Sequence, residues 1–115
     1  NKRLIQFIAD VQDEYQTGIM SNAGDRTRQV IQEDYRLDRY LDGIIISAEE
    51  GVIKPNPRIY QIAMDRMGAS PETTLFIDDT LENVLAAREF GMHAVQFINN
   101  HQALQTMRGY LQREI

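Results

Sequence analysis

The regular alternation of short apolar runs with helix-like stretches constrains the fold of this 115-residue chain more than any other feature. Runs rich in β-branched or aromatic residues predict buried strands. They lie at residues 19–20, 44–47, 75–77 and 94–97. Apolar residues at helical spacing fill the stretches around these runs. Such an alternation is typical of an α/β fold with a mainly parallel sheet and flanking helices.

Glycine and proline mark where several predicted helices begin and end. A first helix is predicted over residues 1–16, with Gly18 ending it, and another is predicted over residues 26–35. Pro57 starts a third helix, because proline suits a first helical turn, and Gly68 caps it. Its predicted buried face consists of Ile59, Ile62, Ala63 and Met67. The remaining predictions are a loop at residues 49–51 and helices at residues 81–90 and 104–111.

The composition argues against several kinds of partner. A net charge of −5 and a pI near 4.9 disfavour binding to nucleic acid or to an anionic membrane. The longest aliphatic run, residues 44–46, is far too short to span a bilayer. The absence of cysteine excludes disulfides and thiolate chemistry. No signal peptide is visible, and we predict one cytoplasmic domain over residues 1–115.

Polar residues follow the carboxyl ends of the predicted strands, and parallel sheets bind their ligands at these ends. Ser21 and Asn22 follow the first strand, and Asp78 and Asp79 follow the third. Lys54 lies in the loop after the second strand. Since the carboxyl ends of parallel strands meet at one edge of a sheet, we expect these residues on one rim. A hydroxyl, a lysine and paired carboxylates can serve phosphoryl transfer, with the carboxylates holding a hard cation such as Mg²⁺.

Each of these residues also has a purely structural interpretation. Ser21 can satisfy a turn at the end of a strand, and Lys54 can be an ordinary solvated lysine. Asp78 or Asp79 can cap the helix that follows, because aspartate favours that position. Two acids at the end of one strand repel each other without a cation, which favours the metal-binding interpretation.

In this order, the hydroxyl, the lysine and the acidic pair resemble motifs two, three and four of the haloacid dehalogenase (HAD) superfamily. The matching segments are residues 18–22, 51–57 and 76–83, and the resemblance extends over roughly residues 4–111. It implies the Rossmann-like core of that superfamily and the activity of a hydrolase. The implied enzyme is a Mg²⁺-dependent phosphatase that acts on a small phosphorylated metabolite through an aspartyl-phosphate intermediate.

The resemblance also implies roles on the phosphate side of the site. Ser21 would bind the transferring phosphoryl group, and Asn22 would assist through its backbone. Lys54 would bridge the phosphate and the acidic cluster. By this resemblance Ser21 and Lys54 are the catalytic candidates in the chain, and all three residues are candidates for substrate binding.

The metal side of the site follows from the same resemblance. Asp79 would be the main ligand of Mg²⁺, and Asp78 would pair with Lys54 or contact the metal through water. Asn83, one helical turn after Asp79, would orient these ligands.

The main departure from the superfamily is the absence of its nucleophile motif. Members begin with a strand that ends in Asp-x-Asp, whose first aspartate attacks phosphorus and whose second acts as general acid and base. No Asp-x-Asp occurs in these 115 residues, and Asp10 and Asp13 are wrongly spaced. The cap domain is also absent, and residues 1–16 resemble the helix that leads from it. We therefore predict a fragment of the core that is inactive alone.

The missing strand has a structural consequence. In the superfamily it lies between the strands that carry motifs two and four, so its loss would bare the backbone groups of two strand edges. We expect these edges to be covered by an upstream segment, by direct pairing of the two strands, or by a homodimer or strand-swapped assembly.

Three alternative functions remain open at the level of the sequence. A 2-haloacid dehalogenase belongs to the same superfamily, but such enzymes need no metal and lack the acidic pair. A non-catalytic interaction module would account for the absent nucleophile. A phospho-accepting receiver domain also uses acids, a hydroxyl and a lysine, but its acidic pair lies near the start of the chain, whereas here it lies at residues 78–79.

Overall fold

The computed structural model describes residues 2–11, 14–22 and 41–112. The chain divides into two compact units, Asn1–Lys54 and Pro55–Ile115, which are described one at a time. The helix predicted over residues 26–35 lies outside the described residues. In the part of the chain that the structure describes, no helix is both long and apolar enough to cross a membrane.

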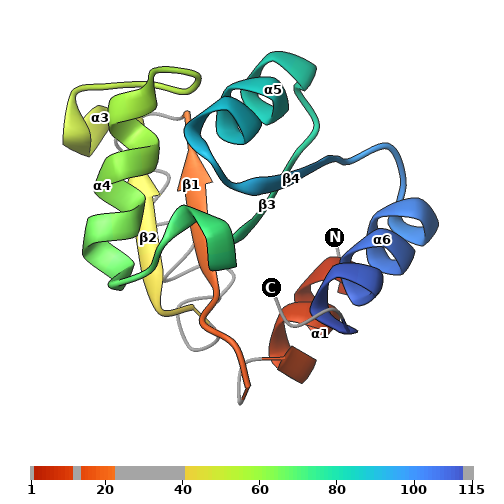
Figure 1. Ribbon diagram of the computed structural model, residues 1–115. Helices are drawn as coiled ribbons and strands as arrows, with labels where there is room; N and C mark the ends of the chain where they lie inside the picture. The colour runs from red at the N-terminus through yellow and green to blue at the C-terminus, as the bar shows by residue number, and fades with distance from the viewer. Residues whose placement is uncertain (1, 12–13, 23–40, 113–115) are drawn as a thin grey trace. The chain divides into compact units, whose positions relative to one another are not determined.

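The first unit begins with helix α1 (Lys2–Val11), which is shorter than predicted (Figure 1). The backbone amides of Glu14 and Tyr15 both donate to the carbonyl of Val11, at 3.1 and 2.9 Å, and so close a turn at its end. Gly18 is the first residue of a strand, so the prediction that it ends the helix was wrong.

Strands β1 (Gly18–Ser21) and β2 (Gly43–Ile46) form a parallel pair, in which Gly18 faces Gly43 and Ser21 faces Ile46. The side chains of β2 are buried on both of its faces, as is usual for parallel sheets. Ile44 and Ile46 pack with Ile19 and Leu41. The predicted strands are therefore confirmed.

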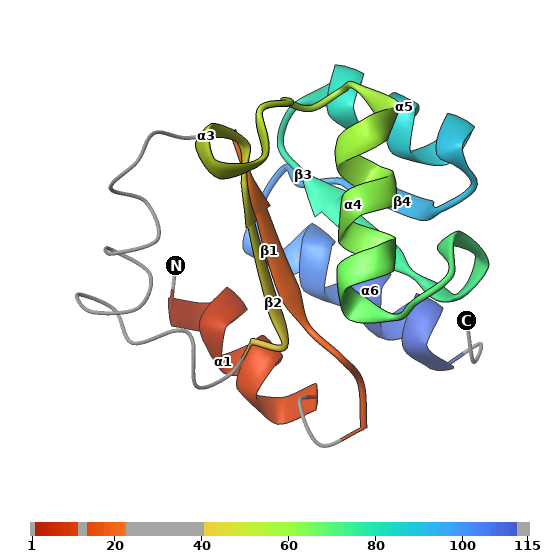
Figure 2. The same cartoon turned by 90° about the vertical axis from the view of Figure 1, so that its left-hand side faces the viewer.

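Helix α3 (Ser47–Glu50) follows β2 without a break (Figure 2). We predicted Ser47 as the end of the strand and residues 49–51 as a loop, and both details were wrong. The amide of Gly51 donates to the carbonyl of Ser47 at 2.9 Å, and Gly51 has a φ of 75°, a value that glycine adopts readily. A single helical turn therefore ends at this glycine.

The second unit begins with helix α4 (Pro57–Met67), which confirms the predicted start and cap. The side chain of Asn56 accepts a hydrogen bond from the amide of Arg58 at 3.0 Å, and Gly68 ends the helix with a φ of 61°. The predicted buried face was partly wrong. The buried residues are Ile59, Tyr60, Ala63 and Met64.

A short 3₁₀ turn, η3 (Pro71–Thr73), leads into strand β3 (Leu75–Asp78). Helix α5 (Leu81–Phe90) then returns the chain to strand β4 (His93–Gln96), which pairs parallel with β3. Helix α6 (Asn100–Gln112) is the last described element. The side chains of Tyr60, Val84 and Ala87 are fully buried between these elements.

Both described sheets are parallel pairs flanked by helices, which confirms the predicted α/β class. Among the described residues, β1 pairs only with β2, and β3 pairs only with β4. Strand β1 of the first unit ends in the polar residue Ser21, and strand β3 of the second unit ends in Asp78.

Candidate active site

Asn22 and Lys54 are joined by a reciprocal pair of hydrogen bonds in the first unit. The Asn22 side chain donates to the Lys54 carbonyl at 3.0 Å and accepts from the Lys54 amide at 2.8 Å. Ser21, the last residue of β1, is next to Asn22 in the chain. The structure thus groups three predicted site residues, and it gives the Asn22 side chain a structural contact that the sequence did not reveal.

The Lys54 ammonium is also oriented by the backbone of β1. Its Nζ donates to the carbonyl of Met20 at 3.1 Å in a half-buried position. This contact holds the ammonium group near the end of β1. The arrangement is suited to an anion bound near the end of β1.

In the second unit, Asp78 is tied to the start of α5. Its Oδ1 accepts from the amide of Thr80 at 2.8 Å, and its Oδ2 accepts from the side-chain amide of Asn83 at 3.3 Å. The residue at the N-cap of α5 is Thr80, so neither Asp78 nor Asp79 occupies that position. The interpretation of Asp78 or Asp79 as the N-cap residue of this helix was therefore wrong.

Asp79 is exposed, unlike Asp78. Among the described residues its carboxylate accepts one hydrogen bond, from the hydroxyl of Thr80 at 3.3 Å. Its backbone carbonyl accepts from the side chain of Gln96 at 3.2 Å, which ties the loop to the end of β4. Asp79 therefore has a fixed backbone and a carboxylate that is accessible to a cation.

Asn83 is one of the few buried polar residues, with a side chain that is 7% exposed. Its carboxamide contacts Asp78, and its carbonyl accepts from the hydroxyl of Tyr60 at 2.8 Å. We did not predict Tyr60 as part of the site, because its position in α4 carried no motif. Burial, with a smaller contribution from the charge of Asp78, raises the pKa of Tyr60 to about 12.

The acidic residues suit Mg²⁺ by the chemistry of their donors. In the described ranges, no group of three or more His, Cys, Asp or Glu side chains is arranged so that it could hold a metal ion. Mg²⁺ does not require one, since it is commonly held by one or two carboxylates together with water and substrate phosphate. Asp79 and Asp78 supply such a pair of oxygen donors, and Asn83 holds Asp78 from the buried side.

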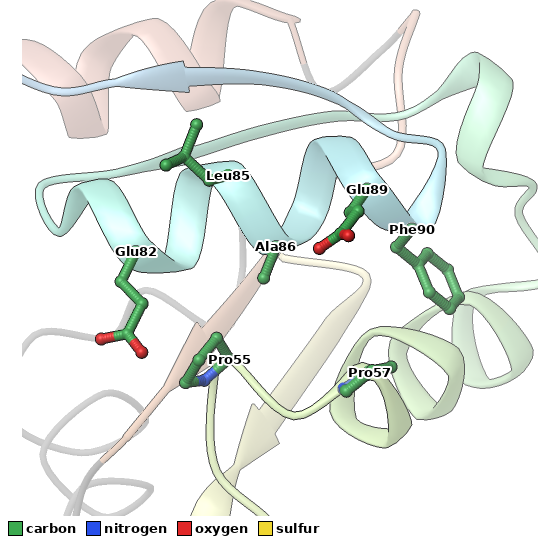
Figure 3. A pocket seen from close by; sticks show the side chains of 7 residues that line it. All are labelled: Pro55, Pro57, Glu82, Leu85, Ala86, Glu89 and Phe90. Carbon is green, nitrogen blue, oxygen red and sulfur yellow. The ribbon is translucent and has the colours of Figure 1, made fainter.

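A separate groove of about 800 Å³ lies along α5 in the second unit (Figure 3). It is lined by Pro55, Pro57, Glu82, Leu85, Ala86, Glu89 and Phe90. The only ionisable side chains in this lining are glutamates, which repel phosphate. None of the predicted site residues lines the groove, so we do not place the phosphate there.

The predicted site residues therefore form two sets, one in each unit. Ser21, Asn22 and Lys54 lie together at the end of β1, and a second set lies at the end of β3. That second set consists of Asp78, Asp79 and Asn83. The convergence of both sets on one rim stays a prediction from the sequence.

Helices around parallel strands, with polar residues grouped at the strand ends, define an α/β protein of the kind that binds ligands at those ends. The family of haloacid dehalogenase-like hydrolases matches residues 3–91. The chain belongs to this family, and the predicted resemblance is confirmed.

Relatives in the family have different substrates. An (S)-2-haloacid dehalogenase 4A from Burkholderia cepacia is 34% identical over 82 residues, covering 71% of this chain and 36% of the relative. A glyceraldehyde 3-phosphate phosphatase from Pyrococcus furiosus is 30% identical over 84 residues, covering 72% of this chain and 35% of the relative. The chain thus spans about a third of the length of these two relatives.

Solved structures show the same fold. A predicted HAD-like family hydrolase from Porphyromonas gingivalis superimposes with a TM-score of 0.81 at 26% identity, covering 93% of this chain and 57% of that protein. A HAD family enzyme from Bacteroides thetaiotaomicron, crystallised with magnesium and inorganic phosphate, superimposes with a TM-score of 0.75 at 24% identity. That match covers 84% of this chain and 52% of the enzyme.

Proposed function

We propose that the chain is part of the core of a Mg²⁺-dependent phosphatase that acts on a small phosphorylated metabolite. The observation that carries this proposal is the acidic pair at the end of β3, where the Asp79 carboxylate is exposed and Asp78 is held by Asn83. By the resemblance described above, a 2-haloacid dehalogenase needs no metal, so the acidic pair favours a phosphatase. The phosphatase from Pyrococcus furiosus and the magnesium and phosphate complex of the Bacteroides enzyme support the same choice.

In this proposal, Ser21 donates its hydroxyl to a phosphate oxygen, and Lys54 neutralises charge on the phosphoryl group as it transfers. The contacts of Lys54 with Asn22 and Met20 fix its backbone and its ammonium group. Asp79 and Asp78 would hold Mg²⁺, which would supply positive charge to the phosphoryl group. The nucleophilic aspartate comes from outside these residues, because no Asp-x-Asp occurs among them.

The alternative function is that of a 2-haloacid dehalogenase. It is favoured by the Burkholderia relative, whose identity to this chain is 34%. The two functions differ in what the site should bind. A phosphatase site binds phosphate more tightly when Mg²⁺ is present. A dehalogenase site binds a small haloacid, and its affinity does not depend on Mg²⁺.

The lysine provides the direct test of the proposed phosphate site. We expect inorganic phosphate to bind the chain in the presence of Mg²⁺, and Lys54→Gln to weaken binding at least about tenfold, since a charged hydrogen bond contributes about 1.5–3 kcal/mol. The chain has one other lysine, Lys2, which is exposed on α1 and provides the matched control Lys2→Gln. Isothermal titration calorimetry with and without Mg²⁺ measures both variants.

Equal weakening by the two lysine variants would contradict a specific site, because it would indicate only a general charge effect. A phosphate affinity that does not depend on Mg²⁺, together with tighter binding of 2-chloropropionate than of phosphate, would favour the dehalogenase.

We also expect the isolated chain to release no phosphate from an aryl phosphate, even with Mg²⁺ present. The reason is the absence of an Asp-x-Asp nucleophile from its 115 residues. A colorimetric phosphate assay measures this. Turnover that survives purification but disappears in Asp79→Ala would show that another residue of the chain acts as nucleophile.

A further inference from the structure

Tyr60 places a hydroxyl group in the interior of the second unit. Its side chain is fully buried, with 0% of its surface exposed. The hydroxyl donates to the carbonyl of Asn83 at 2.8 Å. A buried hydroxyl needs a hydrogen-bond partner, because an unsatisfied one destabilises the folded state. The Tyr60 hydroxyl therefore favours one position of the first turn of α5.

The ring of Tyr60 contacts the two elements that carry the acidic residues. Its centroid lies 5.6 Å from that of Phe76, in an edge-to-face arrangement with an interplanar angle of 85°. It lies 5.9 Å from that of Phe90, at the end of α5 in Figure 3. Phe76 precedes Asp78 by two residues in β3. One side chain of α4 thus packs against both the strand of Asp78 and the helix of Asn83.

The hydrogen bonds at the start of α5 connect this packing to the acidic pair. The amides of Asn83 and Val84 donate to the carbonyl of Thr80 at 3.1 and 3.2 Å, which forms the first turn. The same turn directs the Asn83 carboxamide to Asp78 at 3.3 Å. A shift of the Asn83 backbone would therefore move the side chain that holds Asp78.

We propose that Tyr60 is a positioning residue for the metal site: its hydroxyl holds the first turn of α5, so that Asn83 keeps Asp78 oriented beside Asp79. The inference rests on the proposed function, because it assumes that the acidic pair binds Mg²⁺. Tyr60 itself contacts neither the cation nor the substrate. It acts through the backbone of Asn83.

The variant Tyr60→Phe removes the hydroxyl and keeps the ring. The Asn83 carbonyl lies within α5, where helix geometry supplies a second donor from the backbone. Loss of the Tyr60 hydroxyl therefore does not leave this carbonyl without a hydrogen bond. The matched control is Ile59→Val, which shortens the neighbouring, equally buried side chain of α4. Both changes are expected to destabilise the chain by similar amounts, but only the first removes the contact with Asn83.

The first measurement is amide hydrogen exchange of the metal-free chain by NMR. We expect Tyr60→Phe to lower the protection of the Asn83 and Val84 amides about fivefold beyond its effect on amides near the end of α5, since a lost hydrogen bond is worth about 1 kcal/mol. Ile59→Val should lower protection without this concentration at the first turn. The same pattern in both variants would overturn the proposal.

The second measurement is the Mg²⁺ titration of the same proteins. We expect Tyr60→Phe to weaken Mg²⁺ binding severalfold and Ile59→Val to leave it unchanged. Unchanged affinity in Tyr60→Phe would overturn the positioning role, even if the turn had loosened. A wild-type chain with no saturable response to Mg²⁺ would contradict the proposed function, and the exchange comparison would still decide whether Tyr60 holds the turn.

Discussion

Asp79→Asn is expected to weaken Mg²⁺ binding by the chain about 30-fold. The Asp79 carboxylate is exposed and has only the Thr80 hydroxyl as a described partner, so its charge is accessible to a cation. Two unit charges about 4 Å apart attract each other by about 1 kcal/mol in water, and a divalent cation doubles this to about 2 kcal/mol. That energy corresponds to the stated factor. Isothermal titration calorimetry or NMR titration with Mg²⁺ measures the change.

The control for this prediction is Asp65→Asn. Asp65 is an exposed acid on α4 that accepts a hydrogen bond from Gln61, so its replacement changes the net charge equally. Nonspecific attraction of Mg²⁺ would respond alike to both variants, whereas a site at Asp79 responds to one. Equal loss in both variants, or no loss in Asp79→Asn, would remove the basis for a metal site. Thermal unfolding should be similar in all three proteins, because both carboxylates are exposed.

Much of the fold could be predicted because local residue chemistry decides it. Pro57 has the fixed φ of a first helical turn, and Gly68 reaches the positive φ of 61° that ends the helix. Both boundaries of α4 could therefore be read directly. The single turn of α3 could not, because four residues are too few to show a helical period.

The buried face of α4 could be predicted only in part from the sequence. Apolar spacing favoured Ile62 and Met67, yet Tyr60 and Met64 are the residues that are buried. The rotation of a helix about its axis is set by the neighbours it packs against, here Phe76 and Phe90. The sequence does not show whether a tyrosine is buried or exposed, because its side chain has an apolar ring and a polar hydroxyl.

The same limit applies to the site. The ends of the strands could be predicted, and Ser21 and Asp78 do end β1 and β3. The Asn22 contacts with the Lys54 backbone join residues that are 32 positions apart, and the Tyr60 contact with Asn83 joins residues 23 apart. Such contacts depend on strand register and helix packing, for which no local motif exists.

The raised pKa of Tyr60 predicts a loss of stability between about pH 10 and pH 12. Burial and the charge of Asp78 raise this pKa from 10.0 to about 12 in the folded chain. Below pH 10 the tyrosine is neutral in both states, and its contribution to stability is fully present. Between the two values the unfolded chain has lost the proton and the folded chain has kept it, so the free energy of unfolding falls as the pH rises.

The size of this loss can be measured against Tyr60→Phe. Two pKa units correspond to about 2.7 kcal/mol. Near pH 7 the variant should be less stable by about 1 kcal/mol, because it lacks the hydrogen bond to Asn83. Since the variant cannot ionise at this position, its stability should fall less above pH 10, and the two curves of stability against pH should cross before pH 12.

Urea unfolding at a series of pH values measures both proteins. The control variant Ile59→Val is expected to give a curve parallel to that of the wild type. Curves for wild type and Tyr60→Phe that stay parallel through this range would show that the Tyr60 hydroxyl ionises as readily in the folded chain as in the unfolded one.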